Sequence, residues 1–174
     1  METLDIDQLY ELRVKKGMLP TIDIAGHTFY VDLRMDKLRP KDDFLSNGIF
    51  FSDIENYFDD GIEKYVIPYN PITREFVELD DQITEYPKDL IAISFPHQYT
   101  MDPFGFNRQI GADLKDGLPS SGLRLNFTAK IVPWKETFVA YLIESNKNDA
   151  TKKPSNNSNT EEKASKKKRK GKKI

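Results

Sequence analysis

The chain of 174 residues contains no cysteine. This absence excludes disulfide bonds, a thiolate nucleophile and cysteine-ligated zinc or iron–sulfur clusters. Histidine is also scarce, because only His27 and His97 are present and their separation offers no H-x-H or H-E-x-x-H spacing. We therefore expect neither a metal site nor a cofactor.

Long apolar runs are missing as well. No stretch approaches the roughly 18 apolar residues that a membrane helix needs, so we expect no membrane span. The first residues, Met1 to Asp5, carry acids where a secretory signal would carry bases and an apolar stretch. The sequence thus predicts a cytoplasmic protein, or a nuclear one if the source is eukaryotic and the C-terminal lysine run serves as an import signal.

Charge is divided unevenly along the chain. Residues 1–144 contain 15 Lys and Arg against 25 Asp and Glu, whereas residues 145–174 contain 11 against 3. The net charges are therefore -10 and +8. The second stretch also has no aromatic residue and too little apolar surface to offset the entropy of ordering. We predict a compact acidic domain over 1–144 and a disordered Lys-rich linker and tail over 145–174.

Short periodic segments without regular strand-helix alternation predict the fold of the domain. The expected class is α+β, with a mainly antiparallel sheet of about six strands, two hairpins and about four short helices. In chain order the patterns predict a helix over 5–17, a hairpin of strands 21–24 and 29–33, a helix over 52–58, a second hairpin of strands 64–69 and 74–79, a central strand over 90–95, a helix over 103–110, a strand over 123–132 and a helix over 134–145.

Individual residues also predict side-chain direction, a helix cap and a strand position. In the first hairpin the alternation predicts that five apolar side chains face inward: Ile22, Ile24, Phe29, Val31 and Leu33. Ser52 and Glu55 have capping-box spacing. Pro68 would place its strand at a sheet edge, because proline lacks the N–H that a central strand donates.

One neighbourhood offers candidates for catalysis. His97 follows the apolar strand and precedes Tyr99, and Asp102 with Pro103 is typical of a helix start. Arg108 lies in that helix and would hold an anionic substrate while His97 acted as acid or base. The alternative is that both residues have structural roles only, with Asp102 capping the helix and His97 lying in a loop.

The other acids favour structural roles. Asp23 and Asp32 would form a carboxylate pair if they faced each other across the first hairpin, but the alternation places both on the solvent side. The acids at 53–60 lack the spacing of a calcium loop.

The basic run near the C-terminus is the remaining candidate for binding. Electrostatic contact with phosphates would give it salt-sensitive, sequence-independent affinity for nucleic acid, and an acidic protein surface is an alternative partner. The residues expected to make these contacts are Lys166, Lys167, Lys168, Arg169, Lys170, Lys172 and Lys173.

These observations favour a non-enzymatic cytoplasmic binding or accessory protein whose domain contacts a protein and whose tail binds nucleic acid nonspecifically. Two alternatives stay open. One is a small enzyme with a loop site around His97 and Arg108, and the other is a structural or oligomerising domain with a solubilising tail that acts on the domain alone.

Overall fold

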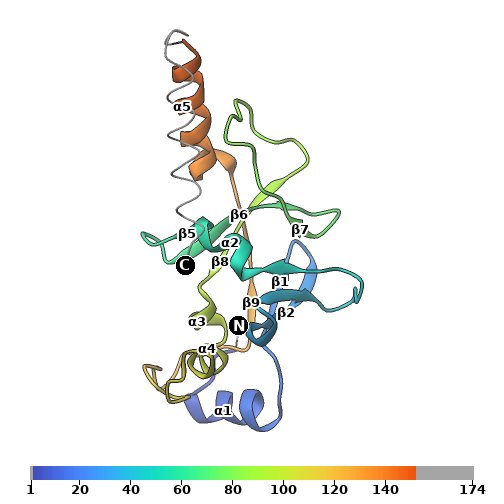
Figure 1. Ribbon diagram of the computed structural model, residues 1–174. Helices are drawn as coiled ribbons and strands as arrows, with labels where there is room; N and C mark the ends of the chain where they lie inside the picture. The colour runs from blue at the N-terminus through green and yellow to red at the C-terminus, as the bar shows by residue number, and fades with distance from the viewer. Residues whose placement is uncertain (1, 152–174) are drawn as a thin grey trace.

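The structure is a computed structural model in which residues 2–151 are described (Figure 1). They form a single α+β domain with two sheets, in the strand orders β4-β3-β2-β1-β9 and β10-β8-β6-β5, and β7 pairs with β6. The strands are β1 (Thr21–Ile24), β2 (His27–Asp32), β3 (Lys37–Pro40), β4 (Ile49–Phe50), β5 (Phe58–Asp59), β6 (Lys64–Asn70), β7 (Glu75–Phe76), β8 (Ile91–Pro96), β9 (Asn126–Thr128) and β10 (Lys130–Val132).

The helices are short except for the last. They are α1 (Ile6–Tyr10), α2 (Phe51–Ile54), α3 (Gln98–Met101), α4 (Pro103–Ile110) and α5 (Phe138–Thr151). A π-helical turn, η1 (Glu11–Lys15), continues α1, and 3₁₀ turns form η2 (Leu33–Met35), η3 (Glu55–Tyr57) and η4 (Trp134–Glu136). The predicted α+β class and mainly antiparallel pairing are confirmed, with β1 and β9 as a parallel pair.

The first hairpin forms as its alternation predicts. Strands β1 and β2 pair antiparallel around the turn at Ala25 and Gly26, and Ile22 lies opposite Phe29. All five side chains predicted to face inward are buried. Because successive side chains of a strand point to opposite faces, the hairpin presents an apolar face to the core and a polar face to solvent.

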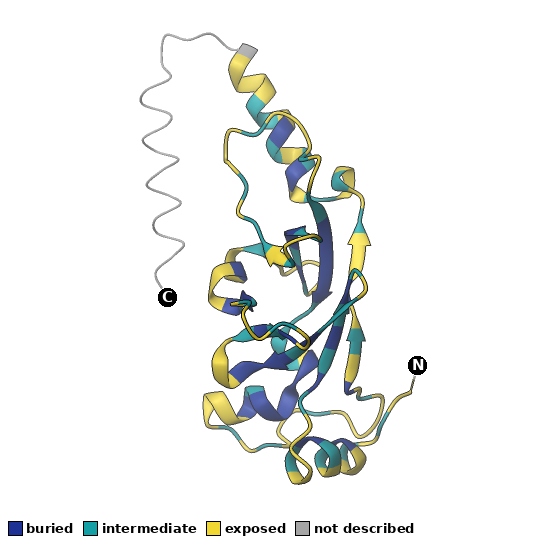
Figure 2. Cartoon of the chain, turned by 90° about the vertical axis from the view of Figure 1, so that its right-hand side faces the viewer, coloured by how far each residue is buried: buried dark blue, intermediate teal, exposed yellow. Residues whose placement is uncertain are grey.

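The core lies between the two sheets. One cluster of buried side chains joins Ile22 and Phe29 of the first sheet with Ile67 and Phe95 of the second, and Phe51 of α2 packs into it. Figure 2 shows these central strands in the colour of buried residues. The predicted central strand is confirmed as β8, which lies between β10 and β6.

A smaller apolar cluster holds the N-terminal segment against α4. Leu9 of α1, Phe104 of α4 and Leu125 form its buried centre. Asp5 caps α1, because its carboxylate accepts the Gln8 backbone N–H while the Gln8 side chain accepts the Asp5 N–H. The N-terminal helix expected over 5–17 is thus present, but it becomes a π-helical turn after Tyr10.

Pro68 does not place its strand at an edge. Strand β6 is central, since β8 pairs along one side and β5 and β7 pair along the other. On that second side β5 reaches Lys64 and Tyr65, whereas β7 pairs with Tyr69 and Asn70. Pro68 directly precedes the residues that pair with β7, and its carbonyl oxygen accepts the Val77 backbone N–H at 3.2 Å, so the strand lacks only the one donor that proline cannot supply.

The strand predicted over 123–132 is divided between the two sheets. Residues of β9 extend the first sheet beside β1, and residues of β10 extend the second sheet beside β8. Between them the backbone N–H of Ala129 donates to the Asp23 carbonyl oxygen at 2.8 Å. Alternation of apolar residues indicates extended backbone, but it does not say with which neighbour each part pairs.

Two further helix predictions need correction. The capping box expected at Ser52 is not formed, since α2 begins at Phe51 and its N-cap residue, Phe50, makes no side-chain cap. The last helix, α5, begins at Phe138 and continues to Thr151, past the predicted domain boundary at 144. Figure 1 shows α5 at one end of the molecule and α1 at the other.

The side chain of Asn146 holds α5 in place. Its Nδ2 donates to the carbonyl oxygens of Asp81 and Ile83, both at 2.7 Å, in the segment between β7 and β8. Of the helices within residues 2–151, none combines the length and hydrophobicity that a membrane span requires.

Candidate functional site

His97 lies where β8 ends and α3 begins. Its Nδ1 accepts the backbone N–H of Tyr99 at 3.0 Å, so the imidazole caps α3. The ring is stacked on Tyr65 with an angle of 5° between the planes, and Phe58 and Phe106 contact it edge-on. The histidine is therefore packed among aromatic rings and is only half-buried.

This environment favours the neutral imidazole. Burial lowers the pKa of His97 below its ordinary value of 6.5, because the charged form is less well solvated among aromatic rings. Since Nδ1 accepts a hydrogen bond, the neutral ring carries its proton on Nε2. In chemical terms His97 is a capping acceptor with one remaining N–H donor.

Tyr99 is anchored away from the imidazole. Its hydroxyl donates to the Asp116 carbonyl oxygen at 3.0 Å, and its ring contacts Phe106. Tyr99 and His97 are thus joined by the hydrogen bond from the Tyr99 backbone N–H to the imidazole, and both rings contact Phe106. The Tyr99 hydroxyl bonds to Asp116 and not to His97.

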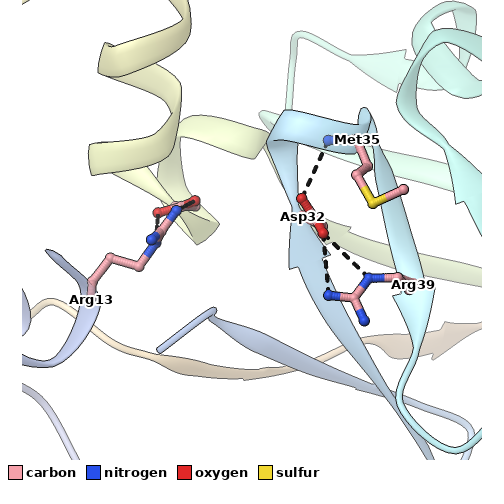
Figure 3. A network of polar contacts seen from close by, with 5 residues as sticks. Arg13, Asp32, Met35 and Arg39 are labelled. Carbon is pink, nitrogen blue, oxygen red and sulfur yellow. Dashed lines mark hydrogen bonds and ion pairs between the residues drawn. The ribbon is translucent and has the colours of Figure 1, made fainter. Parts of the chain in front are cut away.

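Asp102 is occupied by structural contacts. Arg13 donates to it through Nε and Nη2, each at 3.0 Å, and the backbone N–H of Gly105 donates to Oδ1 at 3.2 Å. The predicted N-cap is confirmed by this last bond. Figure 3 shows the Arg13 side chain reaching this carboxylate. Asp102 is completely buried and Arg13 nearly so, so the pair is a buried salt bridge with both carboxylate oxygens engaged.

Arg108 lies on the exposed side of α4, in the last turn before Gly111. A cation suits that position, because the C-terminal end of a helix carries partial negative charge. Among the described residues, no hydrogen bond, ion pair or ring contact links Arg108 to His97, Tyr99 or Asp102. The structure joins His97 to Tyr99, and Asp102 to Arg13 instead.

Sequence reasoning missed Arg13. It lies in the π-helical turn η1, and its partner is 89 positions away, so local spacing carried no signal for the pair. π-helical turns do occur often at functional sites. Here the turn places the guanidinium against the start of α4.

The carboxylate pair considered for the first hairpin is not formed. Asp23 lies opposite Thr28, and its Oδ1 accepts the Gly26 backbone N–H. Asp32 is buried, contrary to the prediction that it lies on the solvent side. It accepts from Arg39 through Oδ2 and from the Met35 backbone N–H through Oδ1, as Figure 3 shows. Within the described chain, no group of three or more His, Asp or Glu side chains is placed to hold a metal ion.

The solvent face of the first sheet carries a feature that sequence reasoning also missed. Lys37 and Arg39 of β3 each lie over an aromatic ring of a neighbouring strand, Phe50 of β4 and Tyr30 of β2 respectively. These contacts depend on strand register, which joins residues 9 and 13 positions apart.

The seven basic residues predicted to contact nucleic acid, from Lys166 to Lys173, lie outside the described residues. Comparison of the chain with protein-family models, with curated proteins and with solved structures found no match.

Proposed function

We propose that this protein is a non-enzymatic binding module that uses its C-terminal basic run to contact the phosphates of nucleic acid. The observation that carries the proposal is the charge division of the chain, in which 11 bases stand against 3 acids after residue 144. Phosphate contacts by Lys and Arg release counterions, and such binding is sensitive to salt and indifferent to sequence. The class of ligand is therefore DNA or RNA, recognised through its backbone.

The acidic surface near α5 supports an internal competitor for the basic run. Residues 75–89 contain six acids and one base and lie beside α5, to which the Asn146 hydrogen bonds tie them. Burial, followed by the charges of Glu78 and Asp81, raises the pKa of Tyr57 to about 12. The Tyr57 ring contacts Phe138 at the start of α5. Acidic side chains thus lie near the start of α5, the helix that precedes the basic run in the chain.

A protein partner for the domain is supported by two exposed apolar side chains. Phe44 and Leu45 are adjacent in the segment between β3 and β4, and they are 92% and 95% exposed. Contiguous exposed apolar surface is typical of contact sites. In this proposal Phe44 and Leu45 are the residues through which the domain contacts a protein partner.

The test compares the wild-type chain with a full-length variant in which the seven basic residues of 166–173 are changed to glutamine. Keeping the length avoids cutting α5, which a truncation at 144 would do. Binding to duplex DNA, single-stranded DNA and RNA is measured by fluorescence anisotropy at several salt concentrations. The variant should bind more weakly, with a salt dependence lowered by about 0.7 to 0.9 per lost phosphate contact.

The control is Lys15→Gln with Lys16→Gln, because both lysines are exposed on the domain and lie outside the segment at 75–89. This control should leave affinity and salt dependence close to those of wild type. Equal binding by the seven-residue variant and the wild-type chain would refute the proposed function.

A further inference from the structure

The solvent face of the first sheet carries a row of cations along β3. Lys37 and Arg39 alternate with Leu38 and Pro40, which are buried, and Lys41 continues the row as the next residue with its side chain exposed. The Lys41 backbone N–H donates to the Thr28 carbonyl oxygen, so the strand pairing extends to this residue. Alternate residues of a strand lie about 7 Å apart on one face. The row is therefore a regular line of positive charge.

Aromatic rings flank this row on both sides. Tyr30 of β2 lies opposite Arg39, and the guanidinium carbon is 4.9 Å from the ring centre. Phe50 of β4 lies opposite Lys37, whose Nζ is 5.3 Å from the ring centre. Tyr30 and Phe50 are both half-buried residues, and a cation lies over each ring.

By register, Asp23 and Asp32 lie on this face, and each accepts a hydrogen bond, Asp23 from the Gly26 backbone N–H and Asp32 from Arg39. Asp32 accepts two hydrogen bonds from Arg39, which fixes the guanidinium beside Tyr30. Within residues 2–150, neither Lys37 nor Lys41 has a carboxylate within ion-pair distance. Uncharged polar side chains, Thr21 and Asn126, extend the face toward β9 in the same register as Tyr30. Two lysines thus keep their charge available for a ligand.

A line of cations between aromatic rings matches the chemistry of a single nucleic-acid strand. Phosphates are attracted to the cations, and unpaired bases stack on aromatic side chains. A duplex uses the cations alone, because its bases are stacked on each other. We infer that the solvent face of the first sheet binds single-stranded nucleic acid, with Lys37 and Lys41 on phosphates and Tyr30 and Phe50 under bases. This site extends the proposed function to the domain and does not depend on the basic run.

The experiment is done in the full-length chain whose seven basic residues of 166–173 are glutamine, so that binding by the run does not mask the sheet. Probes are a mixed-sequence DNA strand, the RNA strand of the same sequence and the DNA duplex. Tyr30→Leu should weaken binding of single strands by about 5-fold to 150-fold, because one stacked base is lost. Tyr30→Phe keeps the ring and should bind like the parent.

Two controls separate stacking from folding. Tyr141→Leu removes an aromatic ring that is 79% exposed on α5 and should leave affinity unchanged. Lys41→Gln, at an exposed position, should reduce the salt dependence for single strands by about 0.7. Thermal unfolding of every variant shows that the fold is retained.

The two proposals fail in different ways. The sheet site is refuted if the parent variant binds no single strand at low salt, if it prefers the duplex, or if Tyr30→Leu binds as well as Tyr141→Leu. None of these results affects the test of the basic run, which compares the wild-type chain with the variant whose seven basic residues of 166–173 are glutamine. A difference between the DNA and RNA probes identifies which strand the site takes.

Discussion

Arg13 and Asp102 are 89 positions apart in the chain and form a two-point salt bridge that joins the N-terminal segment to the start of α4. The Asp102 side chain is 1% exposed, so solvent cannot replace Arg13 as a partner. A buried charge that loses its partner costs much more than an exposed one. The bridge therefore makes the N-terminal helix part of the domain.

Replacing Arg13 with methionine should lower the free energy of unfolding by about 3–5 kcal/mol, because Asp102 is left buried without its cation. Urea unfolding measures the change. Asp7→Asn is the control, since it removes the exposed pair between Asp7 and Lys115 and should cost less than about 1 kcal/mol. Similar losses for the two variants would contradict the role given to the bridge.

Gly105→Ala should destabilise the domain through contact with the same carboxylate. A Cβ at this position would lie 2.1 Å from Asp102 Oδ2 and 3.3 Å from Arg13 Nη2. The expected loss is about 1–3 kcal/mol, because the added atom displaces the bridge. Gly26→Ala is a useful comparison, since nothing lies within 4 Å of a Cβ there and only the positive φ of 87° opposes it.

The free energy of unfolding should depend on pH through protonation of the His97 imidazole. Its pKa is lowered in the folded state, so just below pH 6.5 the unfolded chain binds a proton that the folded chain does not. Stability contributed by the neutral ring is complete above that pH and is lost as the pH falls from 6.5 toward the folded pKa.

NMR titration of the imidazole should therefore show a midpoint below 6.5, with His27→Gln removing the second histidine signal. In His97→Phe, urea unfolding should lose the dependence on pH in this range. A midpoint at or above 6.5 would contradict the effect of burial.

Neutralising the acidic surface beside α5 should strengthen binding of nucleic acid by the wild-type tail. The variant carries Asp80→Asn, Glu85→Gln and Asp89→Asn, which are exposed positions. Under the proposed function these acids compete with phosphates for the basic run, so affinity should rise at low salt and the gain should disappear at high salt.

The matched control removes three acids near α1, at the opposite end of the molecule from α5 (Figure 1). It carries Glu2→Gln, Glu11→Gln and Asp113→Asn, all exposed. An equal gain for both variants would show that total charge, and not the segment at 75–89, sets the affinity.

Local patterns predicted the parts of the fold that local interactions determine. The hairpin of β1 and β2 follows from alternation around Gly26, and α4 follows from Asp102 at its start and Gly111 at its end. In each case the residues that decide the structure lie within one short segment, where periodicity and capping chemistry are visible.

Contacts between distant segments could not be predicted in this way. The neighbourhood of His97 does bring a strand end and two helix starts together, but the partner of Asp102 is Arg13, which no spacing rule indicates. The rings beside Lys37 and Arg39 depend on the register of β2, β3 and β4. Alternation predicts which face a side chain takes and does not predict its neighbour on the next strand.

The division of 126–132 between two sheets bears on how the protein is made. Thr21 is paired with Asn126, 105 positions later, through backbone register and through a hydrogen bond from Thr21 Oγ1 to Asn126 Oδ1 at 2.7 Å. A ribosome delivers β1 before β9, so β1 lacks its second neighbour until the residues up to 128 have been made. When β9 and β10 emerge, one short segment completes both sheets, and the domain cannot finish folding before that point.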